Sequence, residues 1–115
     1  MSETREYTDK ELKEMFVRKL WSTLEYCLND DKMKTPQHKL EVFMHSILAT
    51  LDGCAIDLPG FIIAPISTEE DKQFYISEGE NFYPINDQNA IKGDIGGGLH
   101  EIMYSLKPTS IPERD

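Results

Sequence analysis

Apolar residues recur at helical spacing through the first half of the chain. Between positions 9 and 28 they line two adjacent stripes, which are Leu12, Phe16, Leu20, Leu24 and Cys27, and then Val17, Trp21, Leu24 and Leu28. Residues three, four and seven apart share one face of a helix, so this pattern predicts a helix over 9–28. Thr8 and Glu11 form a capping-box pattern at its start. Because the helix is apolar on two sides, both sides need cover.

A second helix is predicted from Thr35 to a stop at Gly53. Thr35 suits the N-cap, and Pro36 suits the first helical position, where its missing N–H would have no partner. The apolar stripe of this helix is Leu40, Phe43, Met44, Ile47, Leu48 and Leu51. The connection between the two helices is short, roughly six residues, so we expect them to pack as an antiparallel hairpin.

Beyond Gly53 the periodicity changes. The apolar run 61–66 is bounded by prolines and predicts a strand or an extended segment, after a Pro59-Gly60 turn with a positive φ at the glycine. Residues 67–71 resemble a helix cap with acids in the first turn, and this helix would end near Gly79. Residues 99–106 predict a helix or a strand. The expected fold class is therefore α+β, a helical hairpin covered by a short, aromatic-rich, extended second half.

These elements predict one domain over residues 1–115, with flexible tails at 1–7 and 107–115. The chain has 115 residues and a formal net charge of −9, most of it in the second half. Such a field repels phosphate backbones, so we expect no direct nucleic-acid binding, and we expect a partner protein with a basic surface. No apolar stretch approaches the ~20 residues of a membrane span. Two cysteines make no disulfide framework, which indicates buried free thiols and a cytoplasmic location.

One helical face carries residues that could hold a metal ion. His38, Glu41 and His45 lie three, four and seven positions apart in the predicted second helix. Their spacing matches neither HExxH nor the ExxH pairs of di-iron bundles. A solvated outer face explains the same residues, so a metal-dependent enzyme is one alternative, and no cofactor is expected otherwise.

A glycine-rich loop and two tyrosines suggest a small-ligand site. Successive amides of Gly96, Gly97 and Gly98 could wrap an anion at a helix N-terminus, although neither a P-loop nor a dinucleotide fingerprint surrounds them. Tyr83 and Tyr104 lie among acids and could bind a basic or nucleobase-like ligand. A flexible connector and an aromatic cover for the hairpin are the simpler explanations.

The second stripe of the first helix suggests self-association. Val17, Trp21, Leu24 and Leu28 need cover either from the acidic half of the chain or from a second copy. A twofold dimer needs only one self-complementary patch, and tryptophan is enriched at interface hot spots. Both arrangements stay open at this point.

Four short segments resemble a group of small uncharacterised bacterial and phage proteins. They read LDG, DLPGF, ENFYP and LHEIMY, within roughly residues 35–106. The resemblance implies a compact cytoplasmic or prophage-encoded protein and no particular activity. The function that the sequence favours is that of an acidic protein-interaction module, such as a phage accessory factor; the alternatives are a nucleotide-like ligand binder and the metal enzyme.

Overall fold

The computed structural model describes residues 4–86 and 91–113, and it divides the chain into two compact units. The first unit comprises residues 1–61 and 93–115, and the second comprises residues 62–92. Residues 1–3 and 114–115, which belong to the predicted tails, lie outside the described part.

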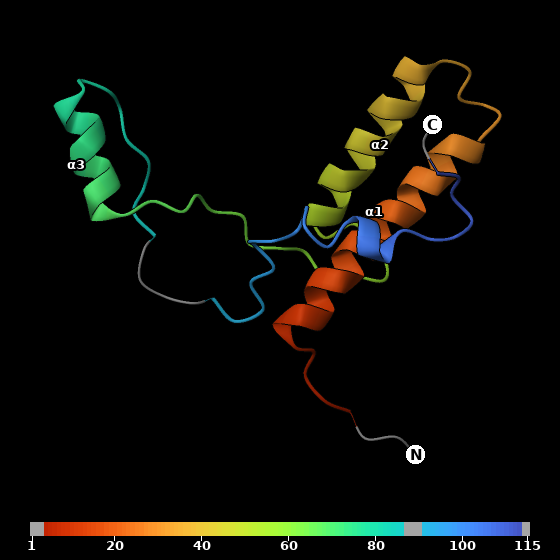
Figure 1. The fold of residues 1–115 in the computed structure, drawn as a ribbon, viewed down its shortest axis with the longest axis horizontal. Helices are drawn as coiled ribbons and strands as arrows, with labels where there is room; N and C mark the ends of the chain where they lie inside the picture. Colours follow the sequence, from red (N-terminus) through yellow and green to blue (C-terminus); the bar gives the residue numbers. More distant parts are fainter. Residues whose placement is uncertain (1–3, 87–90, 114–115) are drawn as a thin grey trace. The chain divides into compact units, whose positions relative to one another are not determined.

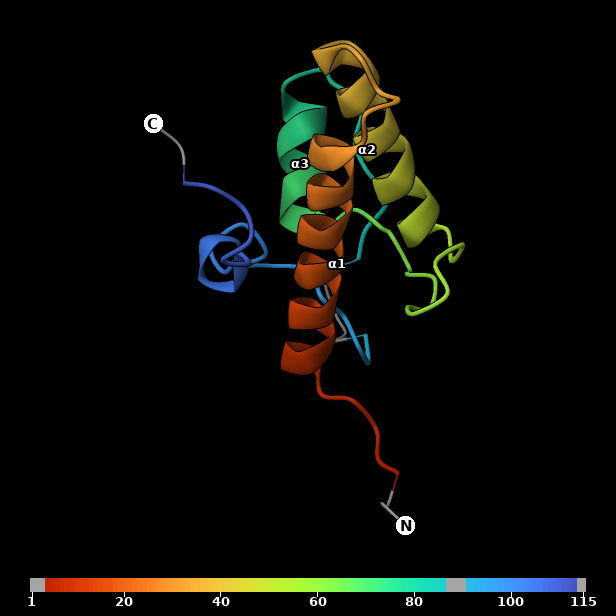
Figure 2. The same ribbon diagram turned by 90° about the vertical axis from the view of Figure 1, so that its right-hand side faces the viewer.

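Two helices, α1 (Asp9–Asn29) and α2 (Pro36–Leu51), form the centre of the first unit and confirm both helix predictions (Figure 1). The α1 capping box is present: Thr8 Oγ1 accepts from the Glu11 amide at 3.1 Å, and Glu11 Oε1 accepts from the Thr8 amide at 2.9 Å. The helices lie side by side and run in opposite directions (Figures 1 and 2). Local capping signals therefore placed these helices correctly.

The loop between the helices is tied to the end of α1. Lys39 Nζ donates to the carbonyl oxygens of Cys27 at 2.8 Å and Leu28 at 2.9 Å. These carbonyls belong to the last turn of α1, where the helix itself offers no N–H to bond them. Met33 in the loop is 6% exposed. A cation at the carbonyl end of a helix also complements the helix dipole. These contacts hold the hairpin closed at the loop.

Two apolar clusters pack on adjacent faces of α1. Phe16, Leu58 and Ile95 form the first, and Val17, Trp21 and Ile111 form the second. The first cluster holds the loop after α2, whose Phe61 ring lies edge-on to Phe16 with centroids 5.4 Å apart. The second holds the C-terminal segment. The two stripes of α1 are thus covered by different parts of the same unit.

The loop after α2 turns at two glycines that touch. Gly53, not Gly60, has the positive φ, at 90°. A Cβ placed on Gly60 would lie 3.2 Å from the Gly53 Cα, so this glycine is needed for close backbone approach. The Phe61 amide then donates to the Leu51 carbonyl at 3.0 Å. The turn predicted at Pro59-Gly60 was therefore wrong: the chain turns at Asp52-Gly53 and bends at residues 56–58, just before this pair.

The C-terminal segment follows α1 from residue 93 onward. The Gly93 amide donates to Asp9 Oδ1 at 3.1 Å, and Trp21 Nε1 donates to the Met103 carbonyl at 2.7 Å. Residues 99–106, predicted as helix or strand, form turns followed by the 3₁₀ helix η1 (Tyr104–Leu106). Ile111, within the expected C-terminal tail, is only 7% exposed.

The second unit contains the helix α3 (Glu69–Ser77), with a complete capping box between Thr68 and Asp71. After α3 the chain returns in extended form, and the Asn86 amide donates to the Ser67 carbonyl at 2.9 Å. This hydrogen bond joins the segments that precede and follow α3. The predicted short helix near Gly79 is confirmed, and Gly79 ends it with φ 73°.

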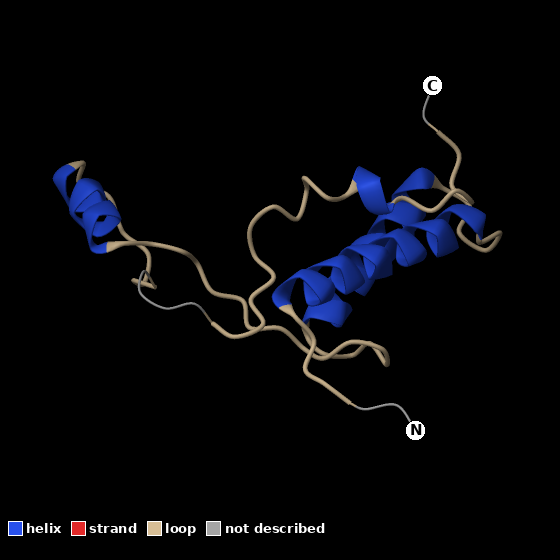
Figure 3. Ribbon diagram, turned by 60° about the horizontal axis from the view of Figure 1, so that its bottom comes forward, coloured by secondary structure: helices blue, strands red, loops and turns tan. Residues whose placement is uncertain are grey.

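The α+β fold class was wrong. Throughout residues 4–86 and 91–113 the regular structure is helical, and no strand is present (Figure 3). The apolar run 61–66 has no regular structure, and its backbone forms no ladder with a neighbour. A strand needs a paired edge, and Pro65 within this run has no N–H to offer. The strand predicted for this run is therefore absent.

Candidate functional site

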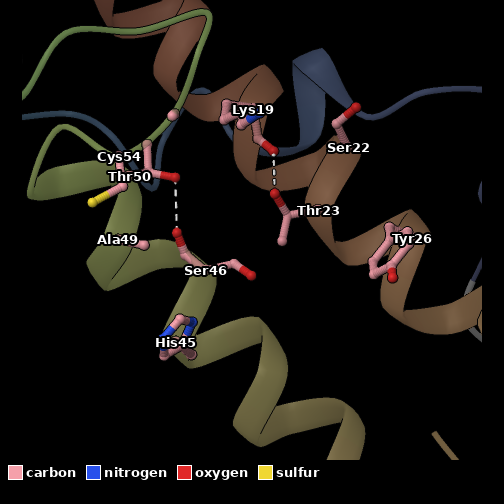
Figure 4. Close-up of a pocket in the computed structure, with 10 residues that line it drawn as sticks. Lys19, Ser22, Thr23, Tyr26, His45, Ser46, Ala49, Thr50 and Cys54 are labelled. Carbon is pink, nitrogen blue, oxygen red and sulfur yellow. Dashed lines mark hydrogen bonds between the residues drawn. The ribbon is translucent and has the colours of Figure 1, made fainter. Parts of the chain in front are cut away.

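An open groove of about 440 Å³ lies in the first unit between α1 and α2 (Figure 4). Its lining consists mainly of small hydroxyl side chains, with one imidazole, one amine and one thiol. The residues are Lys19, Ser22, Thr23, Tyr26, His45, Ser46, Ala49, Thr50, Cys54 and Ala55. Small molecules usually bind at concave surfaces, so this groove is the place within the hairpin where a site for chemistry is expected.

The polar groups of the groove are largely occupied by the protein itself. Thr23 Oγ1 donates to the Lys19 carbonyl at 2.9 Å, and Thr50 Oγ1 donates to the Ser46 carbonyl at 2.8 Å. Lys19 Nζ forms an ion pair with Asp57 at 3.1 Å, and the hydrogen bond from Lys19 lowers the pKa of the Asp57 carboxyl. Bonds within each helix therefore use the hydroxyl protons of the two threonines, and Asp57 balances the lysine charge.

The groove does not assemble a nucleophile with a base. Figure 4 shows Cys54, which follows the end of α2, and His45, which lies within the helix, with Ala49 between them. A catalytic thiol needs an imidazole within hydrogen-bond reach. Among the hydrogen bonds of the described residues, none joins these two side chains. We therefore assign the groove no covalent chemistry.

The residues proposed to hold a metal lie on the exposed surface of α2, and one of them, His45, also lines the groove. His38, Glu41 and His45 are all exposed, and Glu41 Oε2 accepts from Gln37 Nε2 at 2.8 Å. In the described part of the chain, no three His, Cys, Asp or Glu side chains come close enough together to hold a metal ion. Asp52, His100 and Glu101 do not complete such a group. These residues read as the polar side of a surface helix.

The glycine loop is filled by its own acid. Asp94 Oδ1 accepts from the Gly96 amide at 2.8 Å, and Lys13 Nζ donates to the Gly97 carbonyl at 2.6 Å. An anion at the Gly96 amide would displace the Asp94 carboxylate. Gly97 and Gly98 have positive φ values of 89° and 71°, which indicates that glycine is needed at these positions for the backbone conformation. The loop packs on α1, and the Gly96 amide is already hydrogen-bonded to Asp94.

The two tyrosines proposed as ligand contacts belong to different units. Tyr104 lies beside Trp21, with ring centroids 6.2 Å apart, in the first unit. Tyr83 lies beside Tyr75 in the second unit, with centroids 5.8 Å apart. Each ring has its own aromatic neighbour. The structure therefore does not gather the glycines and both tyrosines into one site.

The stripe proposed as a dimer interface is covered mostly from within the chain. Val17 and Trp21 are 5% and 6% exposed against Ile111, and Leu24 packs beside them. Leu28 is 52% exposed and lies outside this cluster. The Ser110 hydroxyl hydrogen-bonds to Glu25 and fastens the C-terminal segment along α1. Of the two arrangements left open by the sequence, the chain's own second half covers Trp21.

Large apolar side chains are instead exposed throughout the second unit. Phe74, Phe82 and Tyr83 are 59%, 48% and 57% exposed. Further exposed apolar residues of the same unit are Ile62, Ile63, Ile66, Ile76, Ile85 and Ile91. Exposed apolar side chains gathered in one unit are a common feature of interaction sites on proteins. It is the strongest candidate site in the described residues.

Sequence reasoning missed the groove and underrated the second unit. The facing hydroxyls Ser22, Thr23, Ser46 and Thr50 were visible as polar gaps beside the apolar stripes, and this signal would have located the groove. The aromatic residues of the second unit were noticed, but cover for the hairpin was the simpler explanation. Deciding between cover and exposure requires knowing which residues pack together.

Comparison with protein-family models, with curated proteins and with solved structures finds no match to this chain. The resemblance to small bacterial and phage proteins therefore stays a prediction. Over the described residues, no helix combines the length and the apolar character that crossing a membrane requires. The geometry of the molecule itself must carry any functional conclusion.

Proposed function

We propose that this protein is a cytoplasmic protein-interaction module whose binding element is the second unit, residues 62–92. The observation that supports this most is the distribution of burial in that unit. Ser67 is the one buried residue among its described positions, whereas its large apolar side chains are exposed or at most half-buried. An element that exposes its apolar side chains in this way is suited to burying them against another molecule.

The second unit is too small to be stabilised by a core of its own. Its single helix, α3, has 9 residues, and isolated helices shorter than ~12–15 residues are marginal in water. The Thr68–Asp71 capping box and the Asn86–Ser67 hydrogen bond give it local order. Apolar burial against a partner would supply the remaining stability.

The aromatic side chains of the unit are already arranged around α3. Tyr75 lies edge-on to Phe74, with centroids 5.9 Å apart, and edge-on to Tyr83. Lys72 Nζ lies 5.1 Å from the centre of the Phe82 ring. These contacts join the helix to the returning segment 82–83. Binding would thus require less ordering of these side chains than a fully disordered peptide does.

Charge defines the chemistry of the partner. Residues 62–92 contain six acidic and two basic residues, a net charge of −4, and three of the acids form the first turn of α3. A fitting partner is a protein with an apolar groove for Phe74 and Phe82, bordered by lysine or arginine. The same charge disfavours a nucleic-acid phosphate backbone.

Affinity capture with the full chain tests this proposal. The wild type and the Phe74→Ser variant are immobilised, and bound proteins are quantified by mass spectrometry. Ile56→Ser is the matched control, because Ile56 is fully exposed but belongs to the first unit. We expect a partner with a basic surface whose affinity falls at least about tenfold with Phe74→Ser and is unchanged with Ile56→Ser.

Salt dependence provides the second measurement. Because opposite charges meet in the proposed complex, raising the salt concentration from about 0.05 to 0.5 M should weaken binding. A partner that binds Phe74→Ser as tightly as wild type, or that is lost equally with Ile56→Ser, would show that the second unit is not the binding element.

A further inference from the structure

The outer face of α2 carries an apolar stripe that the hairpin leaves uncovered. Leu40, Met44 and Leu48 are 67%, 59% and 55% exposed, although the same helix packs other apolar residues toward α1. They are spaced by four residues, so they lie one above another along roughly 12 Å of helix. The groove described above opens beside this stripe and does not include it.

We propose that this stripe pairs with the same stripe of a second copy of the chain, with the two α2 helices antiparallel about a twofold axis. The register follows from the spacing. Met44 is the central residue, so it lies on the axis and meets Met44 of the second copy. Leu40 then faces Leu48 of the other chain, and Leu48 faces Leu40. The two hairpins together would form a four-helix arrangement.

The polar flank of α2 is self-complementary in this register. Glu41 and His45 are both exposed on the same side of the stripe. In an antiparallel pair, equivalent flanks face each other, so the Glu41 carboxylate of one chain lies beside the His45 imidazole of the other, twice by symmetry. An acceptor and a donor thus meet at both ends of the contact. Because this pairing is reciprocal, a second copy is the occupant that we favour.

The net charge of the chain determines how this self-association depends on salt. Each chain carries −9, so two copies repel each other at long range. Salt screens that repulsion without weakening apolar contact, so self-association should strengthen as salt rises to about 0.3 M. This is the opposite of the salt dependence expected for the basic partner. The dimer rests on α2 alone and is independent of the function proposed for residues 62–92.

Sedimentation equilibrium of the full chain over micromolar to submillimolar concentration tests the interface. We expect the wild type to dimerise, and Met44→Glu to raise the dimer dissociation constant at least about tenfold because like charges meet on the axis. Ile56→Glu is the control, since it adds the same charge at an exposed apolar residue outside α2. Circular dichroism verifies that the helices persist in both variants.

A charge exchange tests the register. Glu41→Lys alone should weaken the dimer, and the double variant Glu41→Lys/His45→Glu should restore it, because the reciprocal pairs re-form with opposite sign. A wild type that stays monomeric at every concentration and salt condition overturns the proposal. A dimer that tolerates Met44→Glu overturns the interface, and a double variant that dimerises no better than Glu41→Lys alone overturns the register.

Discussion

The two cysteines occupy different environments, which makes their reactivity a residue-scale test. Cys27 is 4% exposed, and burial raises the pKa of its thiol, whereas Cys54 is exposed. Because the thiolate is the reactive form, iodoacetamide at about pH 8 should modify Cys54 and leave Cys27 largely unmodified. Peptide mass spectrometry after short exposure measures both. In denaturant the two should react at similar rates; equal rates in the native protein would show that Cys27 is accessible.

The carboxyl group of Glu11, in the capping box of α1, has a strongly lowered pKa. Its pKa is lowered from 4.5 to about 2, first by the hydrogen bond from Arg5 and then by that from the Thr8 amide. A lowered folded-state pKa stabilises the protein above pH 4.5, and this contribution disappears as pH falls from 4.5 through about 2. The capping box is therefore an acid-sensitive feature of the helix start.

Arg5→Ala should move the Glu11 pKa back toward its ordinary value. Carboxyl chemical shifts followed by NMR during an acid titration measure the change directly. The stability difference between wild type and variant should be present near neutral pH and should vanish as pH approaches 2. Arg18→Ala, at an exposed arginine within α1, is the control. An unchanged Glu11 titration in Arg5→Ala would contradict the assignment.

At the scale of elements, one substitution distinguishes the two units. Phe16 of α1 is 6% exposed and packs on Phe61, whereas Phe74 of α3 is 59% exposed. Phe16→Ala should lower the free energy of unfolding by about 3–5 kcal/mol, because it leaves a cavity in the core. Phe74→Ala should change it by less than about 0.5 kcal/mol. Chemical denaturation followed by Trp21 fluorescence measures both; similar losses would mean that Phe74 belongs to a core.

For the whole molecule, the decisive contact joins the C-terminal segment to α1. Ile111 packs on Trp21, the single tryptophan of the chain, across a separation of 90 positions in the sequence. Ile111→Ser should hydrate Trp21 and shift its fluorescence to longer wavelength. It should also destabilise the first unit by about 2–5 kcal/mol. Ile62→Ser, at a 77% exposed residue of the second unit, should change neither. An unshifted spectrum for Ile111→Ser would show that the segment does not cover Trp21.

Parts of the candidate sites were also visible in the sequence. The acidic and aromatic character of the second half pointed to a recognition surface, and Tyr83 is indeed exposed there. The metal and glycine-loop hypotheses rested on spacing alone. Spacing could not show that Asp94 occupies the Gly96 amide or that His38, Glu41 and His45 have no further ligand close by within the described residues. Those facts depend on side-chain directions that only folding sets.

The sequence by itself determined the helices, because their signals are local. Thr8, Thr35 and Thr68 each cap a helix within three residues of their own position, and periodicity marks the length between caps. The tertiary structure alone decided what covers each apolar face. It placed Ile111 on Trp21, left Leu40 and its neighbours uncovered, and gave the run 61–66 no strand to pair with. Burial and sheet pairing join residues distant along the chain, so no short window of sequence contains them.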